Sequence, residues 1–288
     1  MKLFKLCRLS VLALTFLFSV SVEAEAPRIV TVGGAATEIV FALGAGNSIV
    51  AVDTSSTFPP KVRMLPQVGY VRNISPEGIL SFEPTLVVAT GALGPPPARQ
   101  MMERFEVPVV WLPDPNSVED LRSSVRSVAT ELNMNAEGDR VLAEIDADLE
   151  MVRSRYSGTD ARPKVLFFLQ PPTLSSAGMA GGLESRADAL IELAGGQNAA
   201  TEFKGFRPVS WEGLVQMNPD VIIIGMSPGH GGTPEDVEAL RESRALGAVG
   251  AIQNGAVYGV PLDDLTFGPR LGEAAQRWSE FVHPDPSE

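Results

Sequence analysis

Apolar residues in the first part of the chain fall in short runs separated by glycines and prolines. In "RIVTVGGAATEIVFALGAGNSIVAVD" the pattern predicts a strand at 28–32, a helix at 36–43 and a strand at 49–52. Two further apolar runs, "TLVVAT" at 85–90 and "PVVWL" at 108–112, predict two more strands. This order and these near-continuous apolar strands are typical of a parallel sheet covered on both faces.

A different pattern occupies residues 116–156, where one glycine and no proline occur. After a capping start at Ser117, apolar residues keep helical spacing, with an interruption at 133–135. We interpret this segment as one long helix, or two in tandem. It would join an N-terminal lobe, 25–115, to a C-terminal lobe, 157–288.

Strands and helices alternate again after Pro163. The pattern predicts strands at 164–169, 220–226 and 256–261 and a last helix at 271–282. The predicted fold class is therefore α/β, with two lobes of mainly parallel sheets joined by one long backbone helix. A cleft between such lobes, near the carboxyl ends of the strands, is the preferred place for a ligand.

One segment occurs in both halves. Residues 75–91 read "SPEGILSFEPTLVVATG" and residues 210–226 read "SWEGLVQMNPDVIIIGM", with Ser, Glu, Gly and Pro in the same places. Each copy predicts a capped helix, a turn marked by proline and a buried strand. Glu77 and Glu212 occupy equivalent positions, in the first turn of each helix, where an acidic side chain also favours the helix dipole.

The first 24 residues have the features of a cleavable signal peptide. A positive start precedes an apolar run at 9–20, which is short for a membrane span, and Val22-Glu23-Ala24 offers a cleavage site. Cleavage after Ala24 would remove Cys7, the one cysteine of the chain. The mature protein would then have no disulfide and no thiolate ligand, which together with export indicates a bacterial periplasm.

The net charge of the chain argues against certain classes of binding partner. The chain has 23 Lys+Arg and 35 Asp+Glu; removal of residues 1–24 takes away three basic residues and one acidic residue, which leaves 20 and 34, a net charge of −14. Such a surface repels nucleic acid and anionic membranes. The G-x-S-x-G, H-E-x-x-H and S-x-x-K motifs are absent from the sequence, so we expect no enzyme.

The stretch "GYVRNISPEG" at 69–78 carries the candidate chemistry. Ferric iron is a hard ion that suits a phenolate oxygen. If the stretch is extended, Tyr70 and Arg72 share a face, so the arginine could support the phenolate or bind a ligand carboxylate. A tyrosine packed at a loop edge beside a solvated arginine is the alternative.

Several stretches together resemble a known family. They are "RIVTVGGAATEIVFALG", "VGYVRNISPEGILSFEPTLVVAT" with "GPP", "AGGQNA", "GFRPVSWEGLVQMNPDVIIIG" and "FGPRLGEA". The chain resembles the haem-specific branch of the periplasmic substrate-binding proteins of ABC importers, a class that also carries vitamin B12 and iron siderophores. The resemblance implies the class III fold, ferric haem (protoporphyrin IX) as transported ligand, Tyr70 as axial ligand of its iron, and Arg72 as its support.

The resemblance also implies partners. Glu77 and Glu212 match the acidic residues that dock on the permease dimer in the inner membrane, and an outer-membrane haem receptor system would lie upstream. The alternative cargo for the same carrier is a corrinoid or a ferric siderophore. A purely structural interaction protein would explain the paired glutamates but not the tyrosine.

The second axial position departs from the family pattern. Some relatives place a histidine after the first strand of the second lobe, where this chain has "LQPPTLSSAGMAGG". Met179 and His230 are the candidates that remain, while His283 is expected in a solvated tail. The main expectation is five-coordinate haem held by Tyr70 alone.

Haem propionates and the porphyrin ring require further residues. The cationic candidates are Arg72, Arg270 and Arg207, because an acidic protein needs local cations to hold carboxylates. Four aromatic residues lie in loops that could face the cleft or the core: Phe58, Phe206, Trp211 and Phe267.

Overall fold

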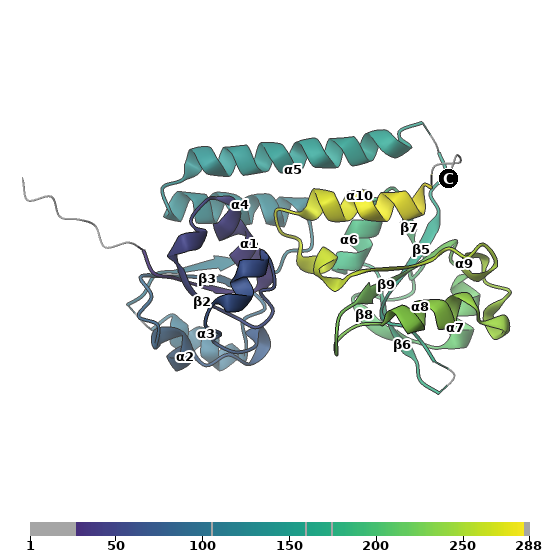
Figure 1. Ribbon diagram of the computed structural model, residues 1–288, viewed down its shortest axis with the longest axis horizontal. Coiled ribbons are helices and arrows are strands. Elements are labelled where there is room, and N and C mark those ends of the chain that lie inside the picture. Colours follow the sequence, from purple (N-terminus) through teal and green to yellow (C-terminus); the bar gives the residue numbers. More distant parts are fainter. Residues whose placement is uncertain (1–26, 105, 159, 174, 285–288) are drawn as a thin grey trace, which may run out of the picture.

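Two lobes lie side by side beneath one long helix in the computed structural model (Figure 1), which describes residues 27–104, 106–158, 160–173 and 175–284. The predicted signal peptide, 1–24, with Cys7, lies outside the described residues. No helix within the described ranges has the length and apolarity to cross a membrane.

The N-terminal lobe is built on a four-stranded parallel sheet in the order β2-β1-β3-β4. Neighbouring residues of β1 and β3 are buried in two different core clusters, so the sheet is covered on both faces. The predicted strands are confirmed within a residue or so. The elements are β1 (Ile29–Val32), α1 (Gly34–Ala42), β2 (Ile49–Val52), α2 (Pro76–Leu80), β3 (Leu86–Thr90), α3 (Pro96–Met102) and β4 (Val109–Leu112).

The C-terminal lobe contains a six-stranded sheet in the order β10-β9-β5-β6-β8, with β7 beside β5. Pairing is parallel except along β6 and β8, which the sequence did not predict. Their sequences, "GMAG" and "FRPV", contain the glycine and proline that strands usually avoid. The strands are β5 (Lys164–Gln170), β6 (Gly178–Gly181), β7 (Gln197–Asn198), β8 (Phe206–Val209), β9 (Val221–Met226) and β10 (Val257–Pro261). The helices are α6 (Arg186–Leu193), α7 (Trp211–Met217), α8 (Pro234–Arg241), α9 (Gly250–Gln253) and α10 (Leu271–Val282).

The linking segment, interpreted from the sequence as one long helix or two in tandem, contains two. It forms two helices, α4 (Val118–Glu131) and α5 (Asn135–Tyr156), packed side by side, and only α5 runs along both lobes (Figure 1). The break falls at Asn133, whose φ of 56° lies in the left-handed region and reverses the chain. α5 has 22 residues, a length of about 33 Å at 1.5 Å per residue.

The core is continuous between the lobes along α5 and α10. One buried cluster includes Leu43 of the first lobe, Ile145 of α5, and Phe167 of the second lobe. Trp278 on α10 is fully buried, stacks on Phe167 and donates a hydrogen bond to Asp264 at 2.9 Å. This shared core supports a fixed arrangement of the lobes around the space between them.

Candidate ligand-binding cleft

A cavity of about 580 Å³ lies between the two lobes and is lined by both of them. This volume is within the range of roughly 300–1,000 Å³ that is common for small-molecule sites. The lining includes residues that directly follow parallel strands, such as Gly33 after β1 and Ser227 after β9, so the cleft lies at the carboxyl ends of the sheets.

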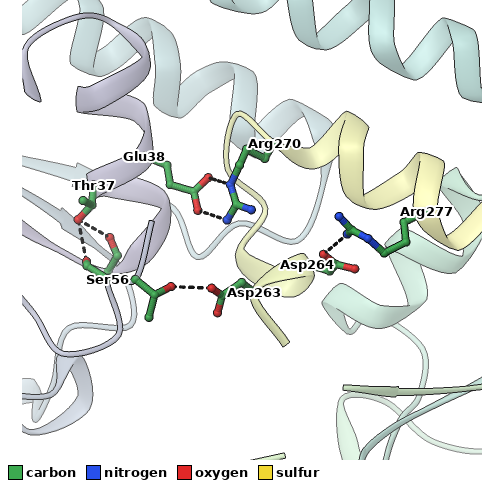
Figure 2. Close-up of polar contacts among 9 residues, drawn as sticks. Thr37, Glu38, Ser56, Asp263, Asp264, Arg270 and Arg277 are labelled. Atoms are coloured by element: carbon green, nitrogen blue, oxygen red, sulfur yellow. Dashed lines mark hydrogen bonds and ion pairs between the residues drawn. The ribbon is translucent and has the colours of Figure 1, made fainter. Parts of the chain in front are cut away.

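A buried carboxylate that the sequence analysis missed shapes the N-terminal wall. Asp53, fully buried after β2, accepts hydrogen bonds from the Gly33 and Ser55 amides at 2.7 and 2.9 Å and from the Ser55 and Ser56 hydroxyls. Ser56 also bonds the Thr37 hydroxyl at 2.7 Å (Figure 2). Asp53 thus ties the Gly33 turn to the loop that carries the cleft residues Thr54, Ser55 and Thr57. An acidic residue at the end of an apolar strand was the available signal.

Tyr70 and Arg72 both line this cleft. Tyr70 is 46% exposed, and its carbonyl accepts a hydrogen bond from the Asn73 amide at 2.8 Å. Residues Val71–Asn73 form a 3-10 turn, so the stretch is extended only up to Tyr70, and both side chains nevertheless line the cleft. Arg72 is exposed and makes no hydrogen bond or ion pair with any described residue.

The opposite lobe contributes two of the predicted residues. His230 lines the cleft from the turn after β9, where its amide donates to the Ser227 carbonyl at 3.2 Å. Phe206 lines the cleft at the start of β8 and packs edge-on against Phe167, with 6.3 Å between ring centroids. The structure therefore brings Tyr70, Arg72, His230 and Phe206 around one space.

Other predicted residues lie elsewhere. Met179 and Arg207 do not line the cleft, and Trp211 packs against the core of the second lobe. Phe267 is buried in the core at 1% exposure. The expectation that His283 lies in a solvated tail was wrong: its ring stacks on Tyr156, with 5.3 Å between centroids.

Arg270 joins the lobes instead of lining the cleft. Its guanidinium donates two hydrogen bonds, of 2.7 and 3.1 Å, to Glu38 on α1 (Figure 2), and it lies 3.9 Å above the centre of the Phe58 ring. Burial raises the pKa of the Glu38 carboxyl, and the hydrogen bonds and charge of Arg270 oppose that rise. A second bond between the lobes runs from the Thr57 hydroxyl to Asp263 at 2.6 Å.

The two glutamates of the repeat are exposed at equivalent helix starts. Ser75 caps α2 and donates to Glu77 at 2.6 Å, and Ser210 caps α7 in the same way. These serine hydrogen bonds hold the pKa of Glu77 and of Glu212 below the usual range. Helices α2 and α7 belong to different lobes and lie away from α5 in Figure 1.

The fold and the cleft together define a substrate-binding protein with two α/β lobes bridged by a helical backbone. The chain belongs to the periplasmic binding protein family, whose sequence profile matches residues 29–263. The family consists of binding proteins of transport systems and not of enzymes.

Solved and curated relatives agree with this class. The periplasmic haem-binding protein RhuT from Roseiflexus sp. RS-1, in apo form, is 32% identical, with a TM-score of 0.79 over 90% of this chain and 98% of that one. A periplasmic haem-binding protein from Pseudomonas aeruginosa is 26% identical, with a TM-score of 0.80 over 90% and 93%. The vitamin B12-binding protein of Pectobacterium carotovorum is 28% identical over 209 residues, 70% of this chain and 72% of its own.

These relatives establish that the chain is a transport binding protein, but they do not distinguish haem from vitamin B12 as its ligand. The chain is the ligand-binding component of an ABC transporter of this class, and its relatives include both haem binders and vitamin B12 binders. The choice between those cargoes depends on the residues of its own cleft.

Proposed function

We propose that this protein binds ferric haem in the cleft between its lobes, through the Tyr70 oxygen, and delivers it to an ABC permease. The observation that carries the proposal is a half-exposed phenol in the cleft. Arg72, which has no partner among the described residues, lies two residues on in the same lining. A corrinoid or a siderophore-bound iron has no need of a protein phenolate, whereas ferric haem has an open axial position for one.

The rest of the cleft suits the same ligand. Phe206, Leu169 and Leu265 supply apolar lining for a porphyrin, while Arg72 offers a cation for a propionate. His230 lies on the other wall and is the candidate for a second axial ligand or a propionate partner. Arg270 is left out of this proposed site because Glu38 already holds its guanidinium.

The test is a visible-absorption titration of the protein lacking residues 1–24 with ferric haem, beside a titration with cyanocobalamin. We expect saturable haem binding with a high-spin spectrum and a charge-transfer band, as for iron held by one phenolate. A low-spin spectrum would instead indicate a second strong axial ligand of the iron, and His230 would be the first residue to substitute in order to identify it. Saturation by cobalamin alone would overturn the haem proposal and leave the carrier class intact.

Delivery would place the protein in the periplasm, exported by the predicted signal peptide, between an outer-membrane haem receptor and an inner-membrane permease dimer. Glu77 and Glu212 are the proposed docking residues, because each presents an exposed carboxylate on a capped helix of its own lobe. Two such charges, one per lobe, suit a partner with two equivalent basic surfaces.

We expect the double variant Glu77→Gln/Glu212→Gln to bind haem as the wild type does but to lose most of its stimulation of the permease ATPase in membranes or nanodiscs. Because the serine bonds lower the pKa of both carboxyls, the wild-type stimulation should persist into mildly acidic solution, where ordinary glutamates begin to protonate. Glu150→Gln on α5, also an exposed glutamate, is the control. Equal stimulation by the double variant and this control would contradict the docking role.

A further inference from the structure

Two arginines line the cleft, one from each lobe, and they differ in their partners. Arg72 has no partner among the described residues. Arg186 of the C-terminal lobe forms an ion pair with Asp114 of the N-terminal lobe, and both residues line the cleft. A haem carries two carboxylates, so a ligand held by Arg72 at one of them still needs a cation for the other.

Arg186 is held in place from its own lobe. It is the first residue of α6, whose cap is Ser185, and its guanidinium also donates to the Leu265 carbonyl at 3.3 Å. This second bond fixes the guanidinium without using up its capacity for a carboxylate, because the group has five donors in a fork. Of the two described acceptors of the Arg186 guanidinium, Leu265 offers a backbone carbonyl and Asp114 a carboxylate. A ligand carboxylate can therefore replace Asp114 with the same kind of bond.

The pair with Asp114 is open to exchange. The Arg186 and Asp114 side chains are 28% and 46% exposed, so water and solutes reach both. Ion pairs of this exposure contribute little net stability. Loss of the pair would leave the lobes joined by the partly buried Glu38–Arg270 pair and by the Thr57–Asp263 bond.

We propose that Arg186 is a second anion-binding residue of the cleft and that Asp114 is an internal competitor, which occupies Arg186 until a ligand carboxylate displaces it. This inference rests on the proposed function, because it requires a carboxylate-bearing ligand in the cleft. Asp114 then lowers the affinity for the ligand and keeps Arg186 neutralised when the cleft is empty. An uncharged ligand cannot take the place of Asp114 on Arg186, so neither residue of the pair should affect its binding.

The test compares variants by absorption titration with ferric haem and with ferric haem dimethyl ester, in the same dilute non-ionic detergent. Asp114→Asn should bind haem about two- to fivefold more tightly than the wild type, since it removes an exposed competing pair. Arg186→Gln should bind about tenfold more weakly, since it loses a charged hydrogen bond. With the dimethyl ester, both variants should match the wild type.

Asp114→Asn frees Arg186 and also removes one negative charge from the cleft. A matched control distinguishes the two effects on haem affinity. Glu184 also lines the cleft, but it pairs with Lys204, so Glu184→Gln removes one negative charge without releasing Arg186. Asp114→Asn should exceed this control in its gain for haem. Asp114→Ser provides a second variant, and thermal unfolding by circular dichroism verifies that each protein folds.

The outcomes separate this inference from the proposed function. Saturable wild-type binding of haem, with Asp114→Asn no tighter than Glu184→Gln, would overturn the competitor role alone. A gain that persists with the dimethyl ester would do the same, because no carboxylate then reaches Arg186. Absence of saturable haem binding by the wild type would overturn the proposed function, and the inference with it.

Discussion

Tyr70→Phe is expected to lower the affinity for ferric haem at least about 100-fold and to abolish the charge-transfer band. Changes in the outer shell of a metal site commonly cost 10–100-fold, so loss of the metal-binding atom itself should cost at least the upper end of that range. The substitution removes one oxygen and keeps the ring, so the shape of the cleft is preserved. Tyr70→Ala should show the same loss of the band.

Two controls make this result specific. Tyr258→Phe removes a phenol oxygen from a ring that stacks on Phe281 and does not line the cleft, so haem binding should be unchanged. Iron-free protoporphyrin should bind wild type and Tyr70→Phe alike, because it offers no metal. Full binding by Tyr70→Phe together with loss in His230→Ala would transfer the axial role to His230.

Arg270→Ala is expected to lower the free energy of unfolding at pH 7 by about 3–5 kcal/mol, as removal of one partner from a buried ion pair does. Glu38 is only 5% exposed, so its carboxylate would be left buried without a counter-charge. Glu38→Gln should cost less, because Arg270 reaches solvent and retains Phe58. The double variant Glu38→Leu/Arg270→Met should lie close to the wild type, since apolar replacements of buried pairs are often neutral.

The same pair sets an expected pH dependence. Burial raises the pKa of Glu38 in the folded protein, so this group contributes its stabilisation fully below its unfolded pKa, and that contribution is lost as the pH rises through the folded pKa. Without Arg270 the folded pKa should rise further, because the opposing charge is gone. The deficit of Arg270→Ala relative to wild type should therefore shrink as the pH falls from 7 toward 5.

Urea unfolding at pH 7 and pH 5 measures both effects. The pH control is Glu38→Gln, which has no carboxyl to titrate at this position. Its deficit relative to the wild type should therefore not shrink between pH 7 and pH 5, but grow by the stability that Glu38 adds to the wild type as the pH falls. A deficit of Arg270→Ala that is equal at both pH values would contradict the assignment of the cost to a charged Glu38. A large loss of stability in the apolar double variant would show that the intact ion pair is itself stabilising. The cost of Arg270→Ala would then not come only from leaving Glu38 without a counter-charge.

Local signals in the sequence were enough for the α/β class and for most of the first lobe. The apolar runs at 49–52 and 85–90 became strands because parallel strands are buried on both faces and cannot carry polar residues in alternation. The repeated serines became matching helix caps, because a cap is a local contact: each serine hydroxyl accepts a hydrogen bond from the backbone amide three residues later. The motif singled out Tyr70, and the structure places it in the lining of the cleft, directly after Gly69 with its φ of 104°.

Contacts between distant segments could not be read from the chain. The strands β6 and β8 exist because β5 offers an edge, although their glycine and proline argue against strands. Arg270 looked like a ligand residue until the fold placed it against Glu38, 232 positions earlier in the chain. Asp53 ends an apolar strand, but that position does not reveal that its carboxylate binds the Gly33 amide, 20 positions earlier. The Asp114–Arg186 pair was missed because its members are 72 positions apart.

The sequence by itself thus determined the periodic elements, the two related halves and the tyrosine motif, because each depends on neighbours within a few residues. Only the tertiary structure decided which charges are paired across the lobes and which stay available to a ligand. The reason is physical: an ion pair forms where folding brings two side chains within a few ångströms, and that distance depends on the packing of both lobes against α5 and α10.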